Sequence, residues 1–575
     1  MTHTKTNPIL RLMPSFADVA FLLPLILLFG GLQGVRNMLG DGDTGWHIRI
    51  GDWILLHHQV PRQDMFSFTK PGQPFFAWEW LWDVGASWLH QHAGLGAVVF
   101  ASLLVISFTT ALLYRLVYRR CGNPLVSILL TGIAAAGASI HWLARPHLFT
   151  MLFLVIYLAI LERVREGRTR LLWALPVLMI PWTNLHGGFL IGIVILGAYC
   201  GGELLRAVLT RDAQERRQAL WIGAKYFAAT AGCLVASLLN PYGYHLYTHL
   251  IEYFQDPFAT KYITEFQGTN FHTPSSIFLE VMLVFGLGAA VWYARRRQFT
   301  EVLMIAGLGH LSLVIVRNMP IYVIAAAPII AAPMVAWLKA LAEAPVAEWI
   351  KIVFANIVEI GEELVPLERP WRLHAASVVV MAVVCLAMAS PKAGLKFKPS
   401  YDPKGYPEKP LAAMNPAWLN RASDGTPRHL FEPGQRIFTH DEWGDYLIYK
   451  LSPRGFKVFV DGRSDFYGGK FGQKYVDVMN VKFDWQQTLD RYGVDTILLP
   501  TDAPLAGALK ESRRWRVAYD DGMAIVFRPA AAASARMEQV FTGTAGGNGG
   551  DRKTASIKQG IPGDHLNQTL EEYNP

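Results

Sequence analysis

The strongest constraint on the fold of this chain is a series of long apolar runs in its first two thirds. A helix that crosses a bilayer core needs roughly 20 apolar residues, and about eleven runs in the sequence approach this length. Only 17% of the 575 residues are charged, which excludes an ordinary soluble enzyme and a largely disordered chain. We therefore expect a polytopic α-helical membrane domain over residues 1–390. The runs lie near residues 18–35, 94–114, 123–142, 147–162, 171–183, 187–205, 221–239, 276–293, 300–316, 319–337 and 373–390.

The charges between the runs predict how the chain is oriented in the membrane. Loops rich in Lys and Arg stay on the cytoplasmic side, and here such loops alternate with loops that carry few of either. The pattern places the N-terminus inside and the C-terminus outside, and we expect a bacterial inner membrane with a periplasmic C-terminal domain. Because most basic residues serve topology, the net charge of +8 does not indicate a nucleic-acid partner. The Arg-rich loops contain Arg115, Arg119, Arg120, Arg163, Arg165, Arg168, Arg170, Arg206, Arg211, Arg216, Arg217, Arg295, Arg296 and Arg297.

Polar residues that are unusual for a membrane protein collect in the loops predicted to be external. Ionisable groups at membrane depth are costly and by default indicate a functional site. Because these residues come from several separate hairpins, we expect them to converge on one cavity that opens outward. The alternative is that each is a helix cap or an interface anchor. The candidate binding residues are His47, Glu79, Asp83, Arg145, His147, Asn184, His186, Tyr242, Glu265, Arg317 and Asn318.

The first external loop, about residues 36–93, contains an Asp-Gly-Asp motif shortly after the first run. Asp41 and Asp43 can share a divalent cation, or one can act as a base while the other orients a partner. The same letters also suit a tight turn. Apolar residues then recur at helical spacing in two stretches, so we expect two amphipathic helices that lie on the outer leaflet. The first stretch runs from Trp46 to Ile54 and the second from Phe75 to Trp82.

The composition changes after about residue 391. We expect a polar, Pro-rich linker over residues 391–425, and strands that alternate with helices then predict a small extracytoplasmic α/β domain over residues 426–530. The tail, 531–575, has the composition of a disordered segment. All four cysteines precede the linker, so the α/β domain has no disulfide. Its strand ends, where α/β sheets place ligands and where helix caps also lie, carry Asp441, Glu442, Asp461, Arg463 and Asp465.

The stretches GDTGWHIRIGDWIL, WTNLHGGFL and DGRSDFYGG, together with an acidic motif in a long first loop, carry a resemblance to a known family. The layout of residues 18–530 resembles the GT-C superfamily of integral-membrane glycosyltransferases, near bacterial members. The match at motif level rests on Asp41-Gly42-Asp43, with Glu79 and Asp83 as further acidic residues of the same loop. The chain departs from the family because its first loop has neither a WWDYG-like signature nor an adjacent Asp-Glu pair, which leaves the donor and the acceptor open.

The resemblance implies transfer of a sugar from a polyprenyl-phosphate donor to an extracytoplasmic lipid, glycan or protein. It makes Asp41 or Asp43 the base that deprotonates the acceptor and the other an orienting group, with Asp43 also a candidate ligand of a divalent metal ion. No other cofactor is implied. Arg145 and Arg317 are then the cations for the departing phosphate. The resemblance implies that His47, His147 and His186 contact the phosphate or a metal ion. It implies that Asn184, Tyr242 and Glu265 bind hydroxyl groups of the sugar.

Two other functions fit the same sequence. A non-catalytic assembly protein of surface-polysaccharide biogenesis would bind a partner through its C-terminal domain, and its Asp-Gly-Asp motif would be structural. A lipid or solute transporter would place polar residues near the middle of the bilayer, often in repeated halves, whereas the central positions of the runs here are mostly apolar. Substitution of Asp43 by Asn separates the enzyme, which would lose activity, from the assembly protein, which would keep working.

Overall fold

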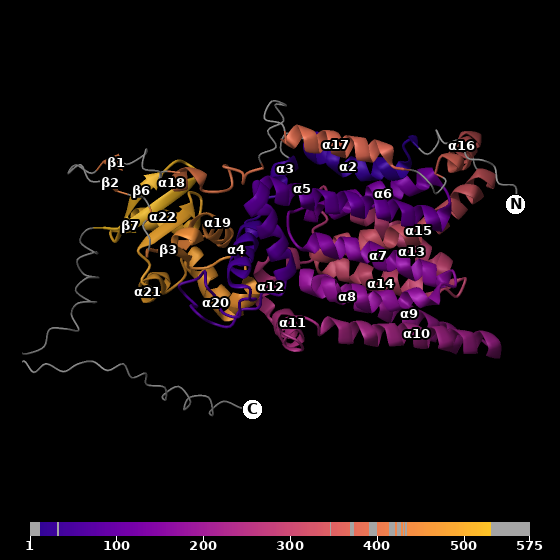
Figure 1. Ribbon diagram of the computed structural model, residues 1–575, viewed down its shortest axis with the longest axis horizontal. Coiled ribbons are helices and arrows are strands. Elements are labelled where there is room, and N and C mark those ends of the chain that lie inside the picture. Colours follow the sequence, from indigo (N-terminus) through magenta and orange to yellow (C-terminus); the bar gives the residue numbers. More distant parts are fainter. Residues whose placement is uncertain are drawn as a thin grey trace, which may run out of the picture.

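The structure, a computed structural model, describes residues 12–30, 34–345, 347–368, 373–389, 399–412, 420–421, 427–428, 431 and 434–530. Its helices form an elongated bundle, and a smaller sheet domain lies at one end of the bundle (Figure 1). This two-part architecture confirms the fold class expected from the sequence. The predicted tail, 531–575, and much of the predicted linker, 391–425, lie outside the described residues.

Among the residues that the structure describes, seven helical segments are long and apolar enough to span a membrane. Shorter apolar helices account for the remaining predicted runs. The long segments are α5 (Trp80–Cys121), α6 with its following turn (Pro124–His141), α7 (His147–Arg165), α9 with its preceding turn (Gly187–Leu209), α10 (Ala213–Ser237), α13 (Ser276–Ala294) and α15 with its preceding turn (Val316–Glu343). The shorter helices are α2 (Phe16–Gly30), α8 (Ala174–Leu185), α14 (Phe299–Val314) and α17 (Ala375–Ala389).

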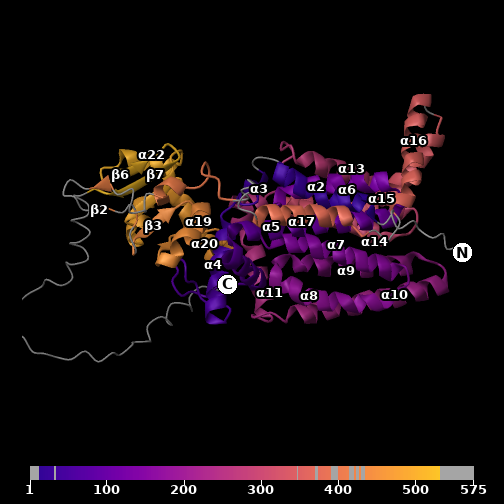
Figure 2. The same cartoon turned by 45° about the horizontal axis from the view of Figure 1, so that its top comes forward.

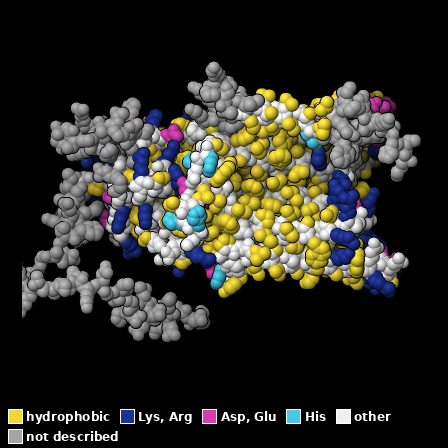
Figure 3. All heavy atoms as spheres, in the orientation of Figure 1, with side chains coloured by type: hydrophobic (Ala, Val, Ile, Leu, Met, Phe, Trp, Pro, Cys, Tyr) yellow, Lys and Arg dark blue, Asp and Glu magenta, His cyan; other side chains and the backbone are white. Residues whose placement is uncertain are grey.

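Side-chain types divide the bundle into a middle band and two ends. Figure 3 shows a broad hydrophobic band, with Lys and Arg gathered at the end that faces away from the sheet domain. Arg120 on α5 and Arg165 on α7 both contact Glu301 on α14, and Arg120 also lies 2.7 Å from Glu162. These ion pairs join Arg-rich loops that the sequence assigns to one side of the membrane. The loops therefore lie together, opposite the sheet domain.

The C-terminal domain contains a five-stranded mixed sheet of order β4-β3-β5-β7-β6. β3 pairs in parallel with β4 and β5, whereas β7 runs antiparallel to β5 and β6. The sequence did not predict α20, because two glycines near its start read as a loop and the helix breaks at Gly468. The elements are β3 (Arg436–Thr439), α19 (Asp441–Leu451), β4 (Lys457–Val458), α20 (Ser464–Met479), α21 (Trp485–Arg491), β5 (Thr496–Pro500), α22 (Pro504–Glu511), β6 (Trp515–Asp520) and β7 (Ala524–Pro529).

The first loop forms helices that pack on protein rather than on lipid. α4 (Asp43–His57) contacts both α5 and α19, between the bundle and the sheet domain (Figure 2). Trp46, Ile50 and Ile54 are at most 8% exposed, so the expected placement of this apolar face on the outer leaflet is wrong. The second expected helix, Phe75 to Trp82, is helical only in its last three residues, because α5 begins at Trp80. α5 then breaks at Gly94 before it continues into the bundle. The apolar face of an amphipathic helix must be buried, and the sequence does not show whether lipid or protein buries it.

The loop between α10 and α13, the fourth of the loops predicted to be external, also reaches the C-terminal domain. The N–H of Gly469 on α20 donates to Asp256, and His249 lies 3.0 Å from Asp465 on α20. The domain thus docks on two separate loops of the bundle. That fourth loop holds α11 (His245–Gln255) and α12 (Pro257–Tyr262), and the remaining described elements are α3 (Gly34–Asn37), α16 (Glu348–Leu364), α18 (Glu408–Ala412), β1 (Asn420–Arg421) and β2 (Pro427–Arg428).

Candidate active site

The glycines around the acidic motif set the position of Asp43. α4 begins at Asp43, and α19 crosses it so closely that a Cβ on Gly42 would lie 2.6 Å from the Cβ of Asp445. A Cβ on Gly45 would lie 2.6 Å from the Cβ of Tyr449. Gly42 has an ordinary φ of −76°, so a close helix contact, and not a tight turn, requires the missing side chain. The motif therefore holds Asp43 at a helix start where two parts of the protein meet.

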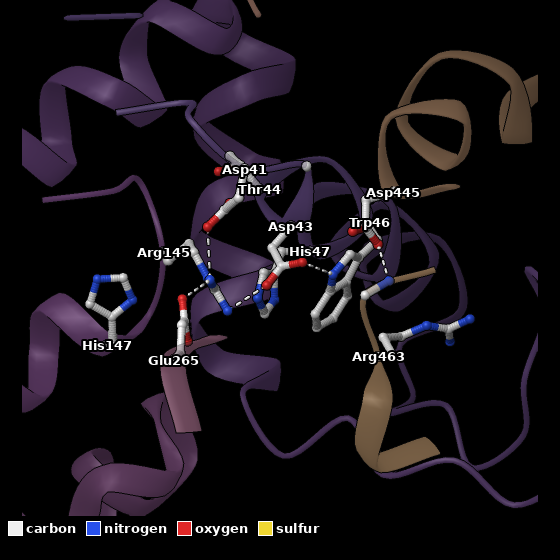
Figure 4. Close-up of polar contacts among 12 residues, drawn as sticks. Asp41, Asp43, Thr44, Trp46, His47, Arg145, His147, Glu265, Asp445 and Arg463 are labelled. Atoms are coloured by element: carbon white, nitrogen blue, oxygen red, sulfur yellow. Dashed lines mark hydrogen bonds and ion pairs between the residues drawn. The ribbon is translucent and has the colours of Figure 1, made fainter. Parts of the chain in front are cut away.

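The loop that carries Arg145 is fastened to the same segment. The hydroxyl of Thr44 donates to the backbone carbonyl of Ala144 at 3.0 Å. Arg145 thereby reaches both aspartates: its Nη1 lies 2.8 Å from Oδ2 of Asp41, and its Nη2 contacts Oδ2 of Asp43. Figure 4 shows the guanidinium between these side chains, with Glu265 on its other side.

Glu265 and Arg317 extend the cluster. A carboxylate oxygen of Glu265 lies 3.5 Å from Arg145, and the other lies 3.2 Å from Arg317. The Arg317 guanidinium also lies over the ring of Phe266. The structure thus brings together five of the residues selected from the sequence, which come from four different loops: Asp41, Asp43, Arg145, Glu265 and Arg317.

Burial and neighbouring charges give the carboxyl groups of this cluster different pKa values. Burial raises the pKa of Asp41 to about 7, with Arg145 opposing the rise and Asp43 adding to it. Burial also acts to raise the pKa of Glu265, but Arg317 and Arg145 outweigh it and hold that pKa at about 2. Oδ1 of Asp41 is buried and has no hydrogen-bond partner among the described residues. At neutral pH the carboxyl group of Asp41 can therefore exchange a proton, whereas that of Glu265 stays ionised.

A second group of candidate residues surrounds Glu79. The Nε2 atoms of His47 and His186 each lie 3.5 Å from one of its carboxyl oxygens, and Nδ1 of His47 lies 2.6 Å from Asp83. Burial raises the pKa of Glu79 to about 8, so this side chain is mainly protonated at neutral pH. Burial, with the nearby charge of Arg145, lowers the pKa of His47 well below its usual value. The group therefore offers neutral hydrogen-bonding side chains beside a charged cluster.

Four other candidate residues use their polar groups to hold the loops together. The amide of Asn184 accepts from the indole of Trp80 and donates to two backbone carbonyls. The hydroxyl of Tyr242 lies between a backbone N–H and a backbone carbonyl of the first loop. Asn318 donates to a carbonyl of α14, and the ring of His147 lies 2.6 Å from a carbonyl in its own loop. The structure assigns these contacts to the scaffold that positions the cluster.

Both carboxylate oxygens of Asp43 already have polar partners in the structure. Its Oδ2 pairs with Arg145, and its Oδ1 accepts the indole N–H of Trp46 at 3.2 Å. The guanidinium of Arg145 already supplies positive charge between the two aspartates. Within the described ranges, no group of three or more His, Cys, Asp and Glu side chains is arranged to hold a metal ion. The assignment of Asp43 as a metal ligand stays a prediction that a chelator tests.

Sequence reasoning missed Asp445, which the structure places beside Asp43. A Cβ on Gly462 would lie 2.6 Å from Oδ1 of Asp43 and equally far from Oδ2 of Asp445. Asp445 is 1% exposed, and the N–H of Gly462 donates to its Oδ1 at 2.9 Å. Burial, reinforced by the charge of Asp43, raises the pKa of Asp445 well above its usual value. The available signal was a carboxylate on the apolar face of the helix WGDYLIYKL, because ionisable side chains are rarely buried without a specific role.

By sequence, the chain matches no protein-family model and no curated protein. By structure, it is similar to the oligosaccharyltransferase of Archaeoglobus fulgidus tethered to an acceptor peptide, with a TM-score of 0.50 and 10% identity over 90% of this chain and 73% of that chain. The chain therefore shares the fold of this oligosaccharyltransferase, a GT-C protein. A second GT-C protein, ArnT from Cupriavidus metallidurans in the apo state, aligns with a TM-score of 0.43 and 15% identity over 90% of this chain and 98% of that chain.

Proposed function

We propose that this protein is a membrane glycosyltransferase that moves a sugar from a polyprenyl-phosphate donor to an acceptor outside the cytoplasm. The observation that carries the proposal is the cluster in which Arg145 bridges Asp41 and Asp43, at the sheet-domain end of the bundle. The cluster combines a cation suited to phosphate with a carboxyl group suited to proton transfer. A GT-C fold agrees with this chemistry. In the proposed orientation, the sheet domain lies outside a bacterial inner membrane and the Arg-rich end lies inside.

A small, mainly apolar cavity of about 20 Å³ lies between α5, α6, α7 and α15. Its lining includes Trp142 and Leu148, which lie three residues before and after Arg145. Apolar side chains therefore flank the loop that carries Arg145 in the sequence. We assign the donor phosphate to Arg145 because a guanidinium presents paired N–H donors to phosphate oxygens. Arg317 is the second cation available to that phosphate.

Asp41 is the best placed base of the cluster. Its Oδ1 has no partner among the described residues, and its pKa of about 7 suits proton transfer near neutral pH. In the proposed reaction Asp41 takes a proton from a hydroxyl or amino group of the acceptor, whose oxygen or nitrogen then bonds to the anomeric carbon of the sugar. The bond from that carbon to the donor phosphate breaks, and the phosphate oxygen leaves with the electron pair beside Arg145. Asp43 orients Arg145 through their ion pair.

The test is sugar transfer by the full-length protein in nanodiscs, with a panel of polyprenyl-phosphate sugars. Asp41→Asn and Asp43→Asn are compared with the wild type and with Asp490→Asn. Asp490 is a control of the same residue type because its exposed side chain forms an ion pair with Arg514, away from the cluster. We expect both site variants to lose most of their turnover while the control keeps it, and a parallel series with EDTA tests the metal prediction.

Two results would contradict the proposal. The first is equal turnover by Asp41→Asn and the wild type. The second is a wild type that binds no donor, together with both Asp variants fully complementing a deletion strain, and this result would favour the assembly protein.

A further inference from the structure

The first loop forms a β-bridge with the edge of the C-terminal sheet. The N–H of Phe68 donates to the carbonyl of Val458 at 3.1 Å, and the N–H of Val458 donates to the carbonyl of Phe66 at 2.9 Å. Ser67 therefore pairs in parallel with Val458 on β4, the edge strand of the sheet. Backbone hydrogen bonds thus join the segment between α4 and α5 to a domain at the other end of the sequence.

A buried ion cluster joins the same two parts of the chain. Nη2 of Arg463 lies 2.9 Å from Oδ1 of Asp64 in the first loop and 2.7 Å from Oδ2 of Asp461. The hydroxyl of Tyr467 also donates to Asp461, at 2.8 Å. Asp64, Asp461 and Arg463 are at most 5% exposed. Removing one member of such a cluster leaves an unpaired charge inside the protein, so the cluster favours a fixed junction over a mobile one.

Arg463 also orders the loop that it contacts. Asp64 accepts from the backbone N–H and the hydroxyl of Ser67, which shapes the turn before the β-bridge. The rings of Phe66 and Phe75 from the first loop and of Phe466 from α20 surround the guanidinium, with centres 4.9 to 5.3 Å away. Arg463 is therefore the point where the loop and the domain converge.

α4 is held on another side by α19. Nε of Arg49 on α4 donates to the backbone carbonyl of Tyr449 at 2.8 Å, and the guanidinium lies over the ring of the same tyrosine. The close approach of α19 at Gly42 and Gly45 lies one to two turns earlier on α4. Asp43, the first residue of α4, thus sits between contacts to the C-terminal domain and its ion pair with Arg145.

We propose that the C-terminal domain is a clamp on the first loop, and that Arg463 is the positioning residue of this clamp, which keeps Asp41 and Asp43 in place against Arg145. The catalytic part of this inference rests on the proposed glycosyltransferase function. The clamp itself needs no substrate, so it is tested separately. The domain then serves the transfer step by fixing the base, and it does not move as an independent binding module.

Hydrogen exchange of the wild-type protein in nanodiscs tests the clamp without any substrate. Segments that open together share one protection level. We expect the amides of α4 and of residues 66–68 to be as protected as those of β3, as one cooperative unit. Exchange in α4 or in residues 66–68 that is at least tenfold faster than in β3 would overturn the proposal.

Arg463→Lys tests the positioning role, because Lys keeps the charge but lacks the planar fork that spans two carboxylates. We expect faster exchange in α4 with no change in α13, and a fall in kcat of about 100-fold, the cost of a small misplacement at a reacting centre. The KM for the donor should change by less than about threefold, since Arg463 is not in the cluster that binds phosphate. Arg514→Lys is the matched control, because Arg514 forms an exposed pair with Asp490 on the same domain.

The outcomes are distinguishable. A folded Arg463→Lys protein with unchanged α4 exchange and unchanged kcat per folded molecule would reduce Arg463 to a structural residue and overturn the positioning role. If Arg463→Lys does not fold, Asp64→Asn replaces the loop partner instead, and the same expectations apply to it. A wild type that exchanges as one unit but transfers no sugar would refute the proposed function and leave the clamp standing.

Discussion

The rate of sugar transfer should rise with pH through a midpoint near 7, because Asp41 must lose its proton before it can act as a base. Burial raises the pKa of this carboxyl group to about 7, Arg145 opposes the rise and Asp43 adds to it. The wild-type rate at pH 6 should therefore be roughly tenfold below its plateau, and at pH 8 it should reach about nine tenths of it.

Two substitutions should move this midpoint in opposite directions. Arg145→Gln removes the charge that lowers the pKa of Asp41, so its midpoint should lie above that of the wild type. Asp43→Asn removes a charge that raises this pKa, so its midpoint should lie lower. Each shift should be about one pH unit or more, because a charge within contact distance shifts a carboxyl pKa by about one to three units. The midpoint is taken from the shape of the pH–rate profile, so a low residual rate does not prevent the measurement.

The same pKa has a consequence for stability. The folded-state pKa of Asp41 lies above the ordinary value of 3.8, so its contribution to stability is fully present below pH 3.8 and is lost as the pH rises through about 7. Over this pH range the free energy of unfolding falls by about 4 kcal/mol. Asp41→Asn cannot ionise, so its thermal stability should improve relative to the wild type between pH 5 and pH 8. A rate midpoint near 4, or one that neither substitution moves, would refute the role of Asp41. Asp490→Asn should match the wild type throughout.

Three further substitutions follow from the geometry. Arg145→Lys should lower turnover by about 10- to 100-fold, because one ammonium group cannot reach both aspartates. Arg119→Lys should leave turnover unchanged, because Arg119 forms an exposed pair with Glu166 at the other end of the bundle. Glu79→Gln should keep turnover within about twofold at pH 7, because the pKa of Glu79 is about 8 and Gln mimics its protonated form. Equal losses in Glu79→Gln and Glu79→Ala would contradict that protonation state. Gly45→Ala should lower the free energy of unfolding by about 1–3 kcal/mol in a thermal melt, because the new Cβ would meet the Cβ of Tyr449. Gly85→Ala is the control, because the space around Gly85 is open and its free energy of unfolding should not change.

The helices of the bundle were predictable because each has a local signal. A run of apolar residues identifies a span wherever its neighbours lie, and the predicted runs match the helices that the structure describes. The alternation of strands and helices in the C-terminal domain is similarly local, and α20 was missed because Gly468 and Gly469 look like a loop. Where a signal belongs to one segment, the sequence alone is sufficient.

The contacts between those segments were not predictable, because they form only when the chain is folded. The sequence singled out Asp41, Asp43 and Arg145 as residue types in external loops, but it did not show that one guanidinium bridges both carboxylates. It read the apolar face of α4 as a membrane surface, although α5 and α19 cover that face. Asp445 was overlooked for the same reason, since nothing local to α19 shows that a loop some 400 positions earlier packs against it.

The most direct test of the account is the release of polyprenyl phosphate from a polyprenyl-phosphate sugar by wild type and by Asp41→Asn in the same nanodiscs. The account predicts that the wild type releases polyprenyl phosphate when an acceptor is present, and that Asp41→Asn, folded and able to bind the donor, does so at least about 100-fold more slowly. Release at equal rates by the two proteins would contradict it.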